Sequence, residues 1–250
     1  MKILVCVKHV PDTETVVKIA DDGASIDESE VNFVVNPYDE FAVEEALQLK
    51  EEHGGEVTIL SLGSEDATSS IRNAMAMGAD KGILLTVENA RMKDSYVIAS
   101  ALADAVNDLE YDIILCGKKA VDSDNHQVGP MLAEMLDIPS VSTIKELSVD
   151  GDAFRAVREV EGATETYEGR LPALFTADKG LNEPRYAALR GIMQAKKKPL
   201  DIREARLPEE TVTVESMEYP PKSPPGKIVG EGPDAVPELV RLLKEEAKVL

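Results

Sequence analysis

The sequence predicts an α/β fold with a doubly wound, mostly parallel sheet and helices on both of its faces. Over the first 140 residues, short apolar runs alternate with longer segments of helical periodicity, which is typical of strand–helix–strand units. The apolar runs, such as ILVCV at 3–7, are nearly continuous, as expected of strands covered on both faces. From Val141 the residues alternate apolar and polar, which predicts a small antiparallel insertion.

The expected elements of the first half follow in chain order. The predicted strands are the apolar runs, joined by one short hairpin and one extended stretch: 3–7, 16–26 (hairpin), 32–35 (extended), 57–62, 82–87 and 112–116. The predicted helices lie between them: 37–53, 65–77, 94–109 and 127–136. The first helix has Asn36 as its N-cap, Pro37 at its first position and Gly54 at its end.

The second half adds different elements to this core. Three alternating runs, 147–149, 154–160 and 164–167, predict the antiparallel insertion, and the apolar run 172–176 returns to the main sheet. The proline-containing stretch 199–232 is expected to be an extended arm, and 233–250 an amphipathic helix. We therefore divide the chain into an α/β domain, 1–199, and an arm with a terminal helix, 200–250.

Composition excludes several classes of protein. The 27 Lys and Arg residues against 47 Asp and Glu residues give a formal net charge of −20, so a nucleic acid is an unfavourable partner. Two cysteines within apolar runs do not make a disulfide framework, and they fit a reducing compartment. No window reaches the roughly 18 apolar residues that a membrane span needs. We expect a soluble, acidic protein of the cytoplasm.

Polar segments follow or precede three of the predicted buried elements. These are 8–12 after the first strand, 36–39 before the first long helix, and 117–130 after the strand 112–116. Ligands of doubly wound sheets bind beyond the carboxyl ends of the strands. The third segment is flanked by glycine and leads into a helix, so its backbone N–H groups could hold phosphate. The GxGxxG and Walker A patterns are absent, and an ordinary surface loop remains the alternative.

The titratable residues do not assemble into a catalytic arrangement. Asp122 and Asp124 form a potential carboxylate pair, but an Asx turn followed by a helix N-cap explains them as well. His126 beside these acids is typical of a solvated loop residue. The two cysteines are interpreted as core thiols, because they lie inside predicted strands. No nucleophile triad and no metal-spaced Cys/His cluster is present in the sequence.

One segment combines basic and apolar residues in a way that predicts a docking surface. Residues 196–198 are three consecutive lysines, and the stretch before them carries apolar side chains within polar sequence. Apolar anchors with a polar rim are typical of protein interfaces. A solvated helix C-terminus, where cations suit the helix dipole, is the alternative explanation of the lysines.

Long motifs distributed along the chain resemble the β subunit of electron transfer flavoprotein. These motifs, in order, are VKHVPD at 7–12, NPYDEFAVEEAL at 36–47, AMGAD at 76–80, GKKAVDSDNHQVGPMLAEML at 117–136 and NEPRYAALRGIMQAKKKP at 182–199. Several long motifs in register are more specific than one short pattern. The resemblance implies a heterodimer with an α subunit that carries electrons on FAD, with a further FAD held mainly by α.

The resemblance also implies roles for particular residues. The adenine-nucleotide site of the domain 1–199 would be formed by strand ends and the third polar segment: Cys6, Asn36, Pro37, Tyr38, Asp39, Leu62, Gly117, Lys118, Lys119, Ala120, Val121, Asp122, Ser123, Asp124, Asn125, His126, Gln127 and Val128. Docking on an acyl-CoA dehydrogenase-type flavoenzyme would use the recognition loop 182–198: Arg185, Tyr186, Leu189, Ile192, Met193, Lys196 and Lys197. Glu159 would help to position the flavin domain of α, and 200–250 would wrap α.

Two branches of this family differ in the β nucleotide. The electron-carrying branch holds AMP and has an aromatic residue after the first aspartate, whereas here Thr13 follows Asp12. The runs KHVPDT and DSDNHQVGP resemble the electron-bifurcating branch. In that branch NADH reduces a second FAD, whose electrons divide between a low-potential and a high-potential acceptor. Asn125 and His126 depart from the small residues of that branch. The resemblance favours FAD in the β site, with AMP as the alternative.

Proteins of other classes remain as competing interpretations. A nucleotide hydrolase of similar build needs a phosphate-gripping Ser-Gly-Gly loop after the first strand, and residues 9–12 are His-Val-Pro-Asp instead. A nucleotide-binding module without a redox role would not need 182–198 or the C-terminal arm. No side chain is expected to act as a nucleophile or general acid, because a flavin itself performs electron transfer.

Overall fold

The computed structural model describes residues 1–222 and 226–250, so residues 223–225 of the expected arm lie outside the described part. The chain divides into two compact units, Met1–Met217 and Glu218–Leu250. Within the described ranges, no helix has both the length and the apolar composition needed to traverse a bilayer.

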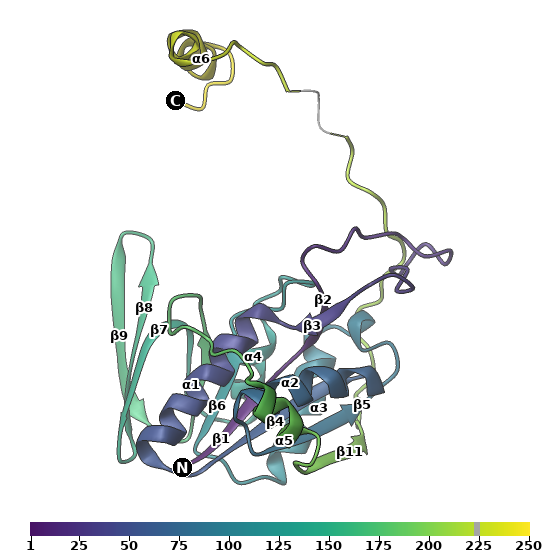
Figure 1. The fold of residues 1–250 in the computed structure, drawn as a ribbon, viewed down its shortest axis with the longest axis vertical. Coiled ribbons are helices and arrows are strands. Elements are labelled where there is room, and N and C mark those ends of the chain that lie inside the picture. The colour runs from purple at the N-terminus through teal and green to yellow at the C-terminus, as the bar shows by residue number, and fades with distance from the viewer. Residues whose placement is uncertain (223–225) are drawn as a thin grey trace. The chain divides into compact units, whose positions relative to one another are not determined.

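A nine-stranded sheet forms the centre of the first unit, and Figure 1 shows it surrounded by helices. Its order is β11-β5-β4-β1-β6-β10-β7-β8-β9. All neighbours from β11 to β7 are parallel, and β7, β8 and β9 form an antiparallel meander. The strands are β1 (Lys2–Cys6), β4 (Glu56–Gly63), β5 (Lys81–Thr86), β6 (Ile113–Gly117), β7 (Ser140–Asp150), β8 (Ala153–Val160), β9 (Ala163–Arg170), β10 (Ala173–Ala177) and β11 (Leu200–Glu204).

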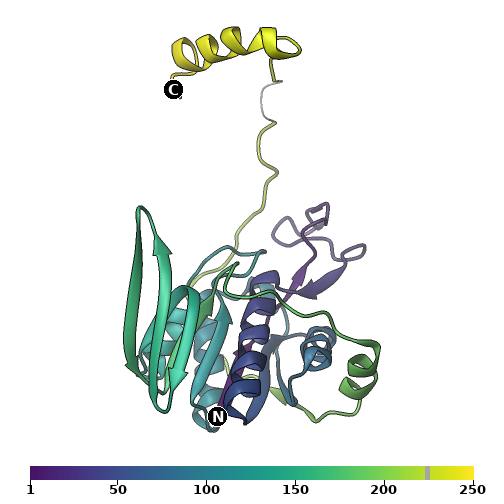
Figure 2. The same ribbon diagram turned by 60° about the vertical axis from the view of Figure 1, so that its left-hand side comes forward.

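Helices cover both faces of this sheet, which confirms the predicted fold class. α1, α2 and α5 share one core cluster with the sheet, and α3 and α4 share the other (Figure 2). The helices are α1 (Pro37–His53), α2 (Thr68–Met77), α3 (Ser95–Asn107), α4 (Val128–Met135) and α5 (Leu189–Ala195). Two single turns, Glu65–Ala67 and Ala90–Met92, follow β4 and β5.

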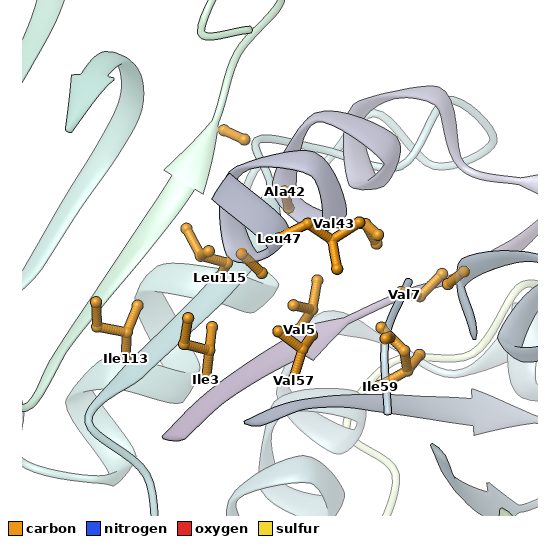
Figure 3. Packing of buried hydrophobic residues seen from close by; sticks show 14 of the residues in the cluster. Ile3, Val5, Val7, Ala42, Val43, Leu47, Val57, Ile59, Ile113 and Leu115 are labelled. Carbon is orange, nitrogen blue, oxygen red and sulfur yellow. The ribbon is translucent and has the colours of Figure 1, made fainter. Parts of the chain in front are cut away.

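The core beneath α1 is mainly aliphatic, in a chain of which only 4% of the residues are aromatic. Figure 3 shows side chains of α1, including Val43 and Leu47, pointing onto Val5, Val57 and Leu115 of three parallel strands. Each of these side chains is almost completely buried. Burial stabilises such a core by roughly 25 cal/mol per Å² of apolar surface, and it fixes the N-terminus of α1 over the strand ends.

The segment between β1 and α1 differs from the predicted hairpin. β2 (His9–Pro11) pairs antiparallel with β3 (Phe33–Val35), whereas the hairpin expected at 16–26 is reduced to one bridge between Ile19 and Ile26. The carboxylate of Asp22 accepts bonds from the backbone N–H groups of residues 24 and 25. Such local side-chain bonds compete with strand pairing.

The C-terminal part also contains an element that the sequence patterns did not predict. Leu200–Glu204 pair with β5 as the edge strand β11, although we had assigned these residues to the arm. Edge strands carry no continuous apolar run, because one side faces solvent, so periodicity does not reveal them. In the second unit, a turn at Pro233–Ala235 leads into α6 (Val236–Glu245), within the helix expected at 233–250.

Candidate nucleotide site and docking loop

A cavity of about 460 Å³ opens at the carboxyl ends of β1, β4 and β6. The chain runs from β1 to β4 and β5 on one side of β1, and it then returns to place β6 on the other side. This reversal is the switch point at which doubly wound sheets bind ligands. The volume lies within the usual range for small-molecule sites.

The floor of the cavity is apolar. Its side chains come from β1, β4, β6 and α3: Cys6, Leu60, Leu62, Ile98, Leu102 and Cys116. An apolar floor with polar groups at the edge is the usual composition of a site for a flat organic ring.

Most of the expected nucleotide-site residues line this one cavity. Cys6, Asp39, Leu62, Gly117–Ala120, Asp122, Ser123 and Asn125–Val128 contribute to its wall. Five expected residues do not line it: Asn36, Pro37, Tyr38, Val121 and Asp124. The structure therefore brings the three polar segments together, but residues 36–38 of the second segment do not line the cavity.

The cavity also has lining residues that sequence reasoning missed. One group, Asn89–Lys93, follows β5 and could have been found by applying the strand-end rule to that strand as well. Another group, Ser25, Ile26 and Glu28, together with Met217, reaches the cavity through long irregular segments. No local pattern marks these residues.

The loop after β6 presents backbone donors at the N-terminus of α4. Among the residues that the structure describes, the N–H groups of Asn125, His126 and Gln127 have no hydrogen-bond acceptor. Asp124 and His126 have φ values of +56° and +55°, a conformation that is uncommon for residues other than glycine. Strained backbone of this kind tends to occur at functional sites. Free N–H groups at a helix N-terminus suit an anion.

Basic side chains surround the same loop despite the acidic composition of the chain. Lys8 Nζ lies 2.8 Å from Asp122, and Lys118 Nζ lies 2.7 Å from Asp178. Lys119 pairs with Asp124. Each of these cations is thus balanced by a carboxylate, and a bound phosphate would compete with those carboxylates for the lysines.

A buried pair of polar side chains at the start of α1 holds the strand ends in place. The Asp39 carboxylate accepts bonds from the backbone N–H of Lys8 (2.7 Å) and of Gly117 (3.1 Å). Asn36 Nδ2 donates to Asp39 (2.8 Å) and to the carbonyl of Lys119 (2.9 Å), and Asn36 Oδ1 accepts from the N–H of Val121. Asn36 stands at the N-cap position as predicted, but its side chain makes no capping bond.

Gly117 is required where β6 meets this pair. A Cβ atom at this position would lie 2.3 Å from Asp39 Oδ1 and 2.7 Å from the carbonyl carbon of Tyr38. Any side chain at this position would push the strand end away from α1. The glycine therefore permits the close approach on which the bonds of Asp39 depend.

The first part of the expected docking loop is fixed to α1. Arg185 Nε and Nη2 each donate to the buried carboxylate of Glu44 at 2.8 Å, and Nη1 donates to Glu51 at 2.5 Å. Asn182 Nδ2 donates to the carbonyl of Phe41 and to Glu45. The guanidinium of Arg185, expected at a partner surface, is thus bound within the chain.

The last part of the loop is fixed to α2. Arg72 donates to the carbonyl of Ala195 at 2.5 Å, and Lys198 Nζ donates to the carbonyls of Met75 and Ala79. A Cβ on Gly191 would lie 2.3 Å from the carbonyl oxygen of residue 76, so glycine allows α5 to lie directly on α2. Lys196 and Lys197 remain exposed, whereas Lys198 turns inward.

Between these two attachments, apolar side chains face solvent. Tyr186 is 99% exposed and Leu189 is 75% exposed, and Ile192 and Met193 are exposed as well. Glu159 lies apart from the loop, exposed on β8 opposite Thr164 of β9. The expected docking residues other than Arg185 are thus exposed between two attached ends of the loop.

The fold and the cavity define a doubly wound α/β protein with a candidate ligand site at its switch point. A family model described as "Electron transfer flavoprotein domain" matches residues 23–207. The chain is 43% identical to the electron transfer flavoprotein subunit beta of Bacillus subtilis (strain 168) over 265 residues, covering all of both chains. It is 40% identical to that of Bradyrhizobium diazoefficiens, again over all of both chains, and 35% identical to that of Homo sapiens over 252 residues, covering all of this chain and 99% of the human one.

The chain belongs to the electron transfer flavoprotein β-subunit family, which places it in electron transport. The comparisons confirm the resemblance drawn from the motifs, although they do not distinguish its two branches.

The pH dependence of stability tests the burial of Asp39. Complete burial raises the pKa of Asp39 from 3.8 to about 7, against the opposing effect of the bonds from Lys8, Asn36 and Gly117. Because this pKa is higher in the folded protein, the unfolded chain loses the Asp39 proton at a lower pH than the folded protein does. The contribution of Asp39 to the free energy of unfolding therefore falls as the pH rises from about 4 to 7. Relative to Asp39→Asn, the wild-type free energy of unfolding should decrease by roughly 4 kcal/mol over that window. Parallel urea-unfolding profiles of the two proteins against pH would contradict this.

The attachment of the docking loop is tested by Arg185→Gln. The substitution leaves the buried carboxylate of Glu44 without its cation, which should lower the free energy of unfolding by about 2 kcal/mol. It should also accelerate tryptic cleavage within 186–197, because the loop is released from α1. Arg206→Gln is the matched control, since Arg206 is exposed and its loss leaves the trypsin sites of 186–197 intact, and it should change stability by less than about 0.5 kcal/mol. Equal cleavage rates in the two variants would contradict the role of Arg185.

Proposed function

We propose that this chain is the β subunit of a heterodimeric electron transfer flavoprotein that binds FAD in the switch-point cavity. It accepts electrons from NADH with flavin-based bifurcation, and it docks on an acyl-CoA dehydrogenase-type flavoenzyme. The cavity carries the proposal, because it combines an apolar floor, unpaired N–H groups and paired lysines at the place where such sheets bind ligands.

The residues around the cavity fit a nucleotide. The floor formed with Leu62 and Cys6 suits a flat ring, and the free N–H groups of Asn125–Gln127 suit a pyrophosphate. Lys8 adds a cation near these donors. When bound, FAD supplies the electron transfer, and the protein supplies binding, orientation and exclusion of water.

The extent of the cavity lining favours a dinucleotide over AMP. Its lining extends from Cys6 and Gly117 at the strand ends to Ser25, Ile26 and Glu28 and to Asn89–Lys93. A mononucleotide needs only part of this surface, so the extent of the cavity supports FAD. AMP, as a structural ligand of a simple electron shuttle, is the alternative.

Reduction by NADH and bifurcation rest on the sequence resemblance. Thr13 after Asp12 and the run DSDNHQVGP at 122–130 are the residues that favour this branch. The chain would then act as part of an NADH-dependent oxidoreductase together with its partners. Two buried, free cysteines favour the cytoplasm as the compartment of the complex.

The α subunit is the proposed partner of the C-terminal segment. Val236, Leu239 and Val240 of α6 are exposed, and an exposed apolar face on a helix needs a partner. We assign to 200–250, other than β11, the role of wrapping α. Glu159, exposed on β8, is assigned to positioning the flavin domain of α.

The exposed side chains of 186–197 are the proposed contact with the dehydrogenase. Leu189 is the central anchor, and Lys196 and Lys197 supply a basic rim. Arg185 and Asn182 hold the loop against α1 instead of contacting the partner, because their polar groups are already bound there.

A nucleotide-binding module or hydrolase without redox function is the alternative from another class. Such a protein would be colourless after purification with its binding partners, whereas a flavoprotein complex is yellow.

The nucleotide content of the purified complex tests the proposed function. We expect that the chain, co-expressed with its α subunit, yields two FAD and no AMP per dimer when the denatured complex is analysed by chromatography. Reduction of both flavins by NADH would support bifurcation. One FAD and one AMP would instead identify a simple electron shuttle and reject the FAD assignment of the cavity.

Docking is tested by Leu189→Ala. The exposed leucine has no role in the core, so flavin content and stability should be unchanged. Loss of a central apolar anchor should weaken binding to the dehydrogenase by about 1–3 kcal/mol, which lowers the rate of electron transfer at limiting concentrations. Val16→Ala, at another exposed apolar residue, is the control. Unchanged transfer rates in Leu189→Ala would reject the loop assignment.

A further inference from the structure

The two cysteines of the chain lie opposite each other in the parallel sheet. Cys6, the last residue of β1, is the register partner of Cys116 in β6. Directly paired residues of adjacent parallel strands point to the same face, and the strands are about 4.8 Å apart. The neighbouring Cys6 thiol is the largest of the influences that raise the pKa of Cys116. The sheet therefore builds a pair of neighbouring thiols from residues 110 positions apart.

This thiol pair belongs to the floor of the cavity. Both side chains line it, although each is buried to more than nine-tenths. Both thiols belong to the same buried apolar cluster as Leu4 and Leu174. A reagent must therefore approach through the cavity, and a ligand lying on the floor would cover both thiols.

The surroundings determine which chemistry the pair favours. Hydrogen bonding from Cys6 and burial both raise the pKa of Cys116, so its thiol stays protonated at neutral pH. A protonated thiol is a poor nucleophile toward alkylating agents and peroxides. A reagent that binds two adjacent thiols does not depend on a strong thiolate, provided that it exchanges an oxygen ligand for sulfur. Such an exchange involves no oxidation.

We propose that Cys6 and Cys116 form a dithiol site for trivalent arsenic compounds, and that occupancy of this site and of the nucleotide cavity are mutually exclusive. An arylarsine oxide reacts with both thiols to form two As–S bonds. Its oxygen leaves as water with the two thiol protons, and arsenic remains trivalent, so no oxidant is needed. Only the mutual exclusion rests on the proposed function; the dithiol itself rests on the register of β1 and β6.

Phenylarsine oxide is the probe for this site. The complex with α is prepared with its nucleotides removed, and the mass of each chain is measured after exposure and a wash with a monothiol. The wild-type chain should retain one phenylarsenic group and lose both free thiols. Cys6→Ala and Cys116→Ala should each retain none, because a single As–S bond exchanges with the monothiol. Dithiothreitol should reverse the wild-type adduct.

The nucleotide provides the second measurement. The rate of labelling should fall in proportion to the fraction of empty sites, about 100-fold when free FAD is at 100 times its Kd. The labelled protein should bind no FAD until dithiothreitol removes the arsenic. Recovery of FAD binding after that treatment shows that the fold was intact, so the result does not depend on the alanine variants.

Failure of the dithiol, failure of the mutual exclusion and failure of the FAD assignment give distinguishable results, and the first two overturn the proposal. The dithiol is rejected if either alanine variant retains the phenylarsenic group as strongly as the wild type does. It is also rejected if labelling occurs only after denaturation. Labelling of the wild type that saturating FAD and AMP leave unchanged rejects the exclusion and also counts against the nucleotide assignment of the cavity. A one-FAD, one-AMP complex in which AMP protects the thiols would reject only FAD as the ligand.

Discussion

The geometry of the cavity depends on the buried hydrogen bonds of Asn36 and Asp39. From one turn at the start of α1, these two side chains bind the backbone after β1, at the end of β6 and within the loop that follows β6. Hydrogen bonds to a carboxylate are stronger than neutral ones, and burial makes their loss costly. The three chain segments that surround the switch point therefore keep one arrangement, and Gly117 lets them approach closely enough.

The proposed docking loop is likewise fixed at its two ends and exposed between them. Arg185 and Arg72 attach its two ends to α1 and α2, while Leu189 and Tyr186 are largely exposed. Rigid support places a contact surface more accurately than a mobile loop does. In a chain of net charge −20, the cavity likewise relies on local donors, because the overall field repels anions. Both the cavity and the loop thus depend on local contacts between elements that pack on the same sheet.

The sequence predicted the parts of this structure that depend on periodicity and chain order. The parallel strands, the helices on both faces and the antiparallel insertion follow from apolar patterns that burial imposes. β11 was missed because an edge strand has no such pattern, and Ser25, Ile26 and Glu28 were missed because an irregular segment brings them to the cavity. The motifs predicted ligand and partner contacts for Asn36 and Arg185, but they could not show that these side chains bind within the chain. Those contacts depend on tertiary packing, which local sequence does not encode.

The most direct test of this account is an experimental structure of the complex with α, purified with its natural nucleotides. Our account predicts nucleotide density over Cys6 and Leu62, with phosphate oxygens at the N–H groups of Asn125–Gln127 and with Asp39 still bonded to Lys8 and Gly117. A nucleotide bound elsewhere on the chain, with the switch-point cavity filled only by water, would contradict it.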